Sequence, residues 1–196
     1  MQWREQYSLR EALADHDRGR ASITGARRIW IDNPYVAAKV ALVQTVAEAN
    51  RCRTAWAKDL GFVVNVGAET DLDLVDLLAT SLLVQASRAM LVAGRHHDVK
   101  GQSRTKSFRL FLLVACATRI GGRLMATSSS VTDELRRDDR FLPVLVARDR
   151  AADEAFTRLF PKTIESQLMA YDTVGLGAGR AAADSAILDV RDSIAG

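Results

Sequence analysis

Cysteine is scarce in this 196-residue chain, which contains only Cys52 and Cys116, far apart in the sequence. Secreted domains of this size that depend on disulfides usually carry more cysteines, at regular spacings. Free cysteine, by contrast, is among the residue types most often buried. We therefore exclude a disulfide scaffold and predict two buried thiols in a reducing compartment.

Long apolar runs are also missing. The longest uninterrupted one is Leu110–Ala117, eight residues, whereas a membrane-spanning helix needs about 20. The first six residues contain no apolar signal segment. On these grounds we expect a soluble, cytoplasmic protein with no membrane partner.

Positive and negative charges are nearly balanced. The chain contains 27 Lys and Arg residues and 24 Asp and Glu residues, which gives a formal net charge of +3. Hydrophobic residues make up 48% and charged residues 26%, which excludes a disordered acidic or basic tail. A chain of this length can bury a core without a metal or a disulfide. The small positive excess permits an anionic partner, so the local clustering of charge carries more information than the sum.

Motifs for metal binding and catalysis are absent as well. The adjacent His96 and His97 occur without an HExxH or CxxC pattern, so we expect a solvated loop there. An apolar helix around Cys116 would raise the pKa of its thiol and leave it inert. We predict no metal and no cofactor, name no catalytic residue, and leave open whether the protein is an enzyme.

Hydrophobic periodicity predicts an α+β fold in which helix dominates. Residues 1–26 are predicted to form an N-terminal arm or remnant helix, with a short helix at 8–17, and residues 27–196 a single α+β domain. The predicted strands are 27–32, 51–58, 62–68 and 164–171. The predicted helices are 34–49, 71–92, 104–125, 142–160 and 175–190.

Local signals refine this outline. The three residues 59–61 between two predicted strands include a glycine and are typical of a hairpin. The run Leu110–Ala117 is apolar on all sides, which predicts a helix in the middle of the domain. We therefore expect a small antiparallel or mixed sheet of about four strands, covered by long helices. The predicted helix caps and breaks are Asn33–Pro34, Thr70, Ser103, Gly94 and Thr127–Ser130.

Positive charge gathers just past the midpoint of the chain. Residues 95–123 contain seven basic residues and one acidic residue, Asp98, an excess larger than that of the whole chain. A loop followed by a helix start can present such side chains to phosphates. The alternative is that the arginines pair with carboxylates at Asp71, Asp73, Asp76 or 133–139. The candidate anion-binding residues of this cluster are Arg95, Lys100, Arg104, Lys106 and Arg109.

A glycine-rich stretch, Gly175–Arg180, follows a predicted strand and opens a predicted helix. Backbone N–H groups at such a place bind phosphates, so Gly177, Gly179 and Arg180 are further anion-binding candidates. The stretch lacks the third glycine of the dinucleotide fingerprint and the lysine of a P-loop. The alternative is close helix packing through the small-residue row Gly175, Gly179 and Ala183.

Several spaced motifs occur between residues 30 and 190: Asn33-Pro34-Tyr35 with Ala38-Lys39, Ala47 to Arg53, Asp71-Leu72 with Thr80 to Ala86, Ser107-Phe108-Arg109 with Arg119-Ile120-Gly121, and Ala178 to Ala182. Together they resemble the C-terminal part of an actinobacterial family of unknown function. Its members usually open with a helical "domain of unknown function twenty-seven eighty-six", which is missing here or reduced to residues 1–20. The resemblance implies a bacterial cytoplasmic protein and supplies no reaction or catalytic residue.

The first hypothesis is therefore a non-catalytic binding module for an anionic partner, with nucleic acid or another polyanion as the candidate. It would act through residues 95–109, assisted by 175–180. One alternative is an enzyme acting on a phosphorylated or acidic small molecule at the glycine-rich turn. Another is a self-associating structural protein, a homo-oligomer, because the long apolar helices and small-residue rows favour helix contacts between copies.

Overall fold

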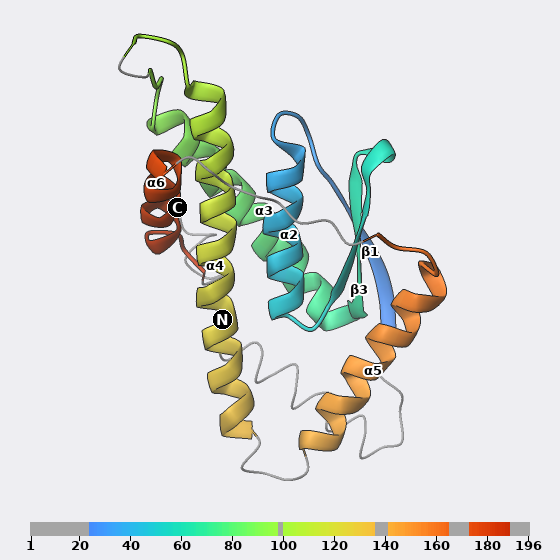
Figure 1. Ribbon diagram of the computed structural model, residues 1–196. Coiled ribbons are helices and arrows are strands. Elements are labelled where there is room, and N and C mark those ends of the chain that lie inside the picture. Colours follow the sequence, from blue (N-terminus) through green and yellow to red (C-terminus); the bar gives the residue numbers. More distant parts are fainter. Residues whose placement is uncertain (1–23, 98–99, 136–140, 165–172, 189–196) are drawn as a thin grey trace.

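Helices dominate the fold and enclose one small sheet (Figure 1). A computed structural model describes residues 24–97, 100–135, 141–164 and 173–188. Figure 1 shows α5 on one side of the sheet and α2 and α3 on the other, with α4 and then α6 beyond them. The elements are β1 (Thr24–Trp30), α2 (Val36–Ala49), β2 (Arg53–Ala57), the short 3-10 turn η1 (Lys58–Leu60), β3 (Phe62–Ala68), α3 (Glu69–Val92), α4 (Thr105–Leu135), α5 (Phe141–Leu159) and α6 (Thr173–Asp184).

The sheet is antiparallel throughout, with strand order β1-β3-β2. The hairpin predicted at 59–61 is confirmed, and Gly61 closes it with a φ of 72° that favours glycine. The described residues form three strands, not about four. The predicted helix 8–17 and almost all of the predicted strand 164–171 lie outside the described residues. β1 begins at Thr24, within residues 1–26, which were predicted to form the N-terminal arm.

The central strand is buried from both sides. Val63 and Val66 are both fully buried, and their odd spacing along β3 puts their side chains on opposite faces of the sheet. Helices therefore cover the sheet on each face, as Figure 1 shows. The two edge strands are more exposed. β1 consists of intermediate and exposed residues, and every residue of β2 is of intermediate exposure.

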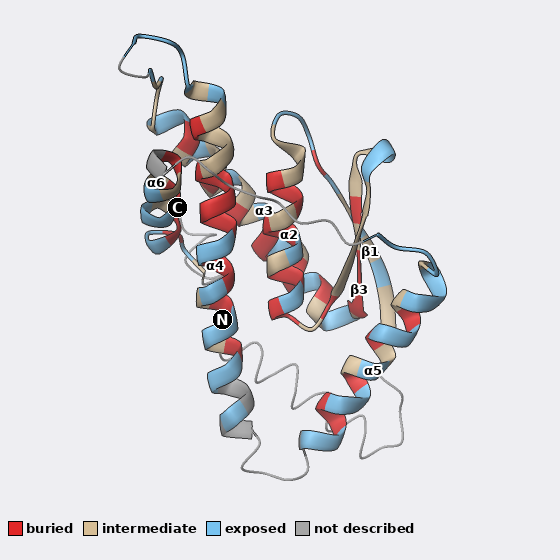
Figure 2. Ribbon diagram, viewed as in Figure 1, coloured by how far each residue is buried: buried red, intermediate tan, exposed pale blue. Residues whose placement is uncertain are grey.

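The middle of α4 lies inside the molecule, as its apolar run predicted. Residues 112–117 are all buried, and α4 packs between α2 and α6 (Figure 2). Small residues let these helices approach closely. A Cβ on Gly121 would meet the side chain of Thr45 on α2, and one on Gly175 would lie 2.7 Å from the carbonyl oxygen of Phe108.

Some predicted helix ends are wrong. α2 begins after Tyr35, which has a left-handed φ of 67°, so Asn33 does not cap it. α3 follows Ala68 and has no side-chain cap, so Thr70 lies within the helix. Both helices lie against the core, whose apolar contacts outweigh a cap of about 1 kcal/mol. The predicted role of Gly94 is confirmed, since it adopts a φ of 70° just after α3.

α4 continues through the serine and threonine cluster that was predicted to end it. The Thr127 hydroxyl donates to the carbonyl oxygen of Arg123 at 3.0 Å, and Ser128 is buried within the helix. A hydroxyl that bonds back one turn is accommodated in a helix interior. α4 therefore runs for 31 residues, about 46 Å at 1.5 Å per residue.

Two described helices have the length and apolar composition of membrane spans: α3 and residues 105–130 of α4. The core helix of a soluble protein has the same properties, so this is weak evidence for a membrane. In α4 the apolar residues at the centre lie in the core between α2 and α6, which accounts for their composition.

Candidate anion-binding surface

The basic loop, which we define as residues 95–106, comprises the connection between α3 and α4 and the first two residues of α4, and it is closed at its base. The carbonyl oxygen of His96 accepts hydrogen bonds from the Arg104 N–H at 2.8 Å and from the Thr105 hydroxyl at 3.2 Å. The same hydroxyl accepts from the His96 N–H at 3.0 Å. His97 and Ser103 form a backbone bridge one step further along. The two ends of the loop are therefore fixed to the start of α4.

His96 anchors this base instead of lying in solvent as predicted. Its ring stacks on Phe108, which is buried, with 3.5 Å between ring centroids and an interplanar angle of 21°. Its Nε2 lies 3.0 Å from the carbonyl oxygen of Ala93 at the end of α3. His97 is exposed, as the solvated loop prediction requires. His96 thus ties the loop to the core.

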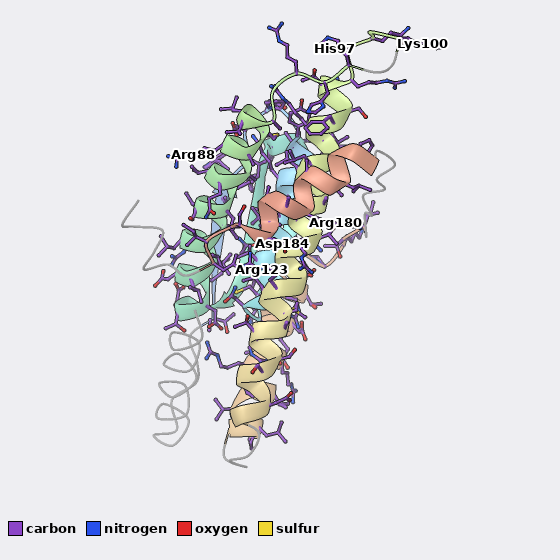
Figure 3. All side chains as sticks on the ribbon, turned by 90° about the vertical axis from the view of Figure 1, so that its left-hand side faces the viewer. Arg88, His97, Lys100, Arg123, Arg180 and Asp184 are labelled. Carbon is purple, nitrogen blue, oxygen red and sulfur yellow. The ribbon has the colours of Figure 1, made fainter. Side chains whose placement is uncertain are left out.

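The exposed cations of the basic loop lie at one end of the molecule. Arg95, Lys100, Arg104 and Lys106 are all exposed. Figure 3 shows Lys100 and His97 at the tip, beyond the ends of α3 and α4. Within the described part of the chain, Arg95 and Lys106 make no ion pair. Four of the predicted site residues are therefore exposed within one short segment between the end of α3 and the start of α4.

Arg109 differs from its four neighbours in the predicted site. Its side chain is half-buried on α4, and its Nε is buried without a hydrogen-bond partner among the described residues. Arg109 therefore points partly toward the protein interior, and we leave it out of the exposed surface.

Two more arginines of the basic cluster have structural partners. Arg119 on α4 pairs with Asp184 of α6 at 2.6 Å between Nε and Oδ1. Arg123 Nη1 donates to the carbonyl oxygens of Ala183 and, at 3.1 Å, Ala186. The last carbonyls of a helix lack partners within it and attract cations. These arginines hold the end of α6 and do not add to the anion-binding surface.

Three of the carboxylates predicted as alternative partners of the cluster pair with other residues, whereas the acids of 133–139 lie mostly outside the described residues. Asp71 pairs with Arg148 of α5 at 2.6 Å. Asp73 and Asp76 both pair with Arg27 of β1. Burial raises the pKa of Asp76, opposed by its hydrogen bond from Arg27. The predicted pairing of the cluster with these three acids is therefore wrong.

The glycine-rich stretch is not a turn. It lies inside α6, which begins at Thr173, and the free N–H groups of a helix belong to its first four residues. Gly177 and Gly179 lie beyond that turn, so their prediction as backbone anion ligands is wrong. Gly179 instead lies against the carbonyl oxygen of Leu112, and Ala183 is fully buried. The packing alternative for this small-residue row is confirmed.

Arg180, the remaining predicted site residue, is exposed on α6. Figure 3 shows it along the side of the molecule, away from the tip of the basic loop. The structure therefore does not bring Arg180 together with Lys100.

Sequence reasoning missed a set of ion pairs that fastens α5 to the rest of the fold. Arg51 and Arg53, beside and within β2, pair with Asp149 and Asp153 at 2.9 and 2.6 Å. Arg148 adds the buried pair with Asp71 described above. The partners lie 77 to 100 positions apart in the sequence, so no local sequence pattern predicts these ion pairs.

Sequence reasoning also missed a small pocket of about 210 Å³ between the end of α2 and the second half of α4. Its polar lining carries both signs of charge, from Glu48, Arg51 and Asp133, next to Ser128 and Ser129. The mixed charge gives it no preference for an anion. In the described ranges, no three His, Cys, Asp or Glu residues form a group that could hold a metal ion.

Comparison with known protein families, curated proteins and solved structures found no match to this chain.

Proposed function

We propose that this protein is a non-catalytic module that binds an anionic partner, with nucleic acid as the partner class, through the basic loop. The observation that carries the proposal is the position of Arg95 and Lys106 at the two ends of the loop. Both are exposed, and neither makes an ion pair with another described residue. Lys100 and Arg104 lie between them and are exposed as well.

The closed base of the loop supports this function. Hydrogen bonds between His96, Arg104 and Thr105 fix its ends before any partner arrives. A segment whose two ends are already fixed loses less conformational entropy on binding than a flexible tail. Cations held in one region also raise the rate at which an anion is captured.

The shape of the surface favours a polymer over a small phosphorylated molecule. Small ligands are usually held in concave pockets, whereas the four cations of the basic loop are all exposed and Lys100 lies at the tip of the molecule (Figure 3). The enzyme alternative required phosphate-binding amides at Gly177–Arg180, and that segment lies within α6. A chain of phosphates can meet several of the exposed side chains at once.

The test is a fluorescence polarization titration of a labelled oligonucleotide duplex with the full chain. The double variant Arg95→Glu, Lys106→Glu reverses two charges on the loop. The control variant Lys58→Glu, Arg180→Glu makes the same change in net charge at exposed positions outside it. We expect the loop variant to lose at least tenfold in affinity and the control to lose much less. Equal losses in both variants, or no binding by the wild-type chain at low salt, would contradict the proposal.

A further inference from the structure

One end of the sheet carries an exposed tryptophan. Trp30, the last residue of β1, is 66% exposed. It lies opposite Phe62 of β3, and Ala57 of β2 lies opposite Phe62 on the other side. Opposed residues of antiparallel strands project from the same face of the sheet, so these three side chains share one face. Because the side chain of Ala57 is small, β2 does little to cover the two aromatic rings.

α5 covers the other end of the same face. Arg53 of β2 lies opposite Val66 of β3 and pairs with Asp153 of α5 at 2.6 Å. Val66 is fully buried, and it projects from the same face as Phe62, because the two residues are an even number of positions apart on one strand. Phe62 is only half-buried. Figure 1 shows the hairpin end of the sheet extending beyond α5. Among the described residues, α5 therefore leaves the Trp30 end of the face open.

The residues at this open end hold one another in a fixed geometry. We define Trp30, Phe62 and Arg28 as the Trp30 platform. The rings of Trp30 and Phe62 meet edge to face, with 5.1 Å between centroids and an interplanar angle of 74°, an arrangement that aromatic pairs prefer. The Arg28 guanidinium lies 4.6 Å from the centroid of the Phe62 ring and 5.7 Å from that of the Trp30 ring. Phe62 and Arg28 therefore orient the indole before any ligand arrives.

Positive charge accompanies the aromatic rings. Arg28 is exposed, and it makes no ion pair within the described part of the chain. The strand positions that share this face include no acidic residue. Lys58 and Asp59 are both exposed in the adjacent turn, so that turn adds no net charge. The Trp30 platform thus combines an exposed indole with a cation, which suits a ligand that is both aromatic and anionic.

We propose that the Trp30 platform stacks an unpaired base of a single-stranded nucleic acid, while Arg28 contacts a neighbouring phosphate. This inference rests on the proposed function for its class of partner and adds the form in which that partner is bound. Bases inside a duplex are already stacked on one another, so an indole reaches the ring of a base only when the base is unpaired. Aromatic side chains combined with cations are the usual means of holding single strands. The platform therefore adds affinity for single strands and none for a duplex.

Stacking is tested with two labelled strands, a short deoxythymidine oligonucleotide and an abasic strand with the same number of phosphates. We expect the wild-type full chain to bind the deoxythymidine strand about tenfold more tightly, from the usual contribution of one stacked base. Trp30→Leu keeps an apolar side chain but removes the ring, so it should lose this preference. Trp30→Phe keeps a ring and should retain most of it. The abasic strand should bind all three proteins alike.

Tryptophan fluorescence gives a second readout. The deoxythymidine strand should quench the wild-type protein more than Trp30→Phe, because stacking brings a base onto the indole. Circular dichroism checks that both variants fold. Equal affinity of the wild-type chain for the two strands, or an unchanged preference in Trp30→Leu, overturns the proposal. Loss of self-association in Trp30→Leu without any change in strand binding also overturns it, because the platform would then contact a second copy of the chain.

The loop variant Arg95→Glu, Lys106→Glu separates this inference from the proposed function. If the platform fails and the proposed function holds, the loop variant loses affinity for both strands while Trp30→Leu binds like the wild-type chain. If the proposed function fails and the platform holds, the loop variant keeps its affinity for both strands while Trp30→Leu still loses the preference for bases.

Discussion

Gly179 of α6 lies directly against the backbone carbonyl oxygen of Leu112 on α4, so a Cβ at position 179 would collide with it. A second obstacle, the Cβ of Ala115, lies 2.7 Å from the same point. Because both obstacles belong to a buried helix, neither can move aside as a flexible side chain would. The contact between α4 and α6 therefore depends on the absence of a side chain at this position.

The first prediction compares two glycines of the same helix. Gly179→Ala is expected to destabilise the protein by about 1–3 kcal/mol, the usual cost of overpacking. Gly177→Ala adds a methyl group where nothing lies within 4 Å, and it replaces glycine in a helix interior, so it should stabilise by up to about 1 kcal/mol. Urea denaturation of the two variants measures both values. Similar effects at the two positions would contradict the packing described for α6.

A second prediction concerns the buried pair of Arg148 and Asp71, whose side chains are 5% and 14% exposed. Arg148→Met leaves the Asp71 carboxylate buried without this partner, which typically costs about 3–5 kcal/mol. The matched control is Arg150→Met, two residues along α5, whose pair with Glu154 is well exposed. Exposed pairs contribute about 0–1 kcal/mol. Thermal or urea unfolding should separate the two variants clearly, and comparable losses would show that the Arg148 pair is not buried in solution.

The third prediction concerns the two thiols. Burial raises the pKa of Cys52 to about 12 and that of Cys116 to about 11, from an ordinary value of 9.0. The folded protein at pH 8 should therefore react very slowly with a thiol reagent, and both cysteines should react once urea unfolds the chain. Counting the reactive thiols in each state checks this, and a thiol that reacts fast in the native state would refute the burial of that residue.

The same pKa shifts give a fourth prediction, for stability against pH. Above about pH 9 the unfolded thiols ionise while the folded ones stay protonated, so ionisation favours the unfolded chain. The stability associated with the protonated thiols is present below pH 9 and is lost as the pH rises toward 11 and 12. The free energy of unfolding should fall over this range, and the fall should be smaller in the Cys52→Ala, Cys116→Ala variant. An identical pH profile for variant and wild type would count against the shifts.

The hydrophobic periodicity of the sequence predicted most of the helices and strands. The alternating residues Phe62, Val64 and Val66 predicted β3, and the apolar run 110–117 predicted the core position of α4. The ends of elements were less predictable. Asn33 and Thr70 have the side chains of helix caps, yet the starts of α2 and α3 lie elsewhere, since tertiary packing outweighs a single cap.

The candidate site was predictable only in part. The exposure of Arg95 and Lys106 follows from a polar loop, which the sequence shows. By contrast, Arg119 and Arg123 look like the other cations of the cluster until their distant partners on α6 are known. The sequence of Gly175–Gly179 is compatible both with a phosphate-binding turn and with helix packing, and it favours packing. Only the position of α6 against α4 decides between them.

The central claim, that the basic loop meets phosphates, is tested most directly by the salt dependence of duplex binding. The logarithm of the affinity falls linearly with the logarithm of the salt concentration, with a slope of about 0.9 for each phosphate contact. If Arg95 and Lys106 each contact a phosphate, the Arg95→Gln, Lys106→Gln variant should show a slope smaller in magnitude by about 2. A slope identical to that of the wild-type chain would contradict the claim, since the anion would then be held by other residues.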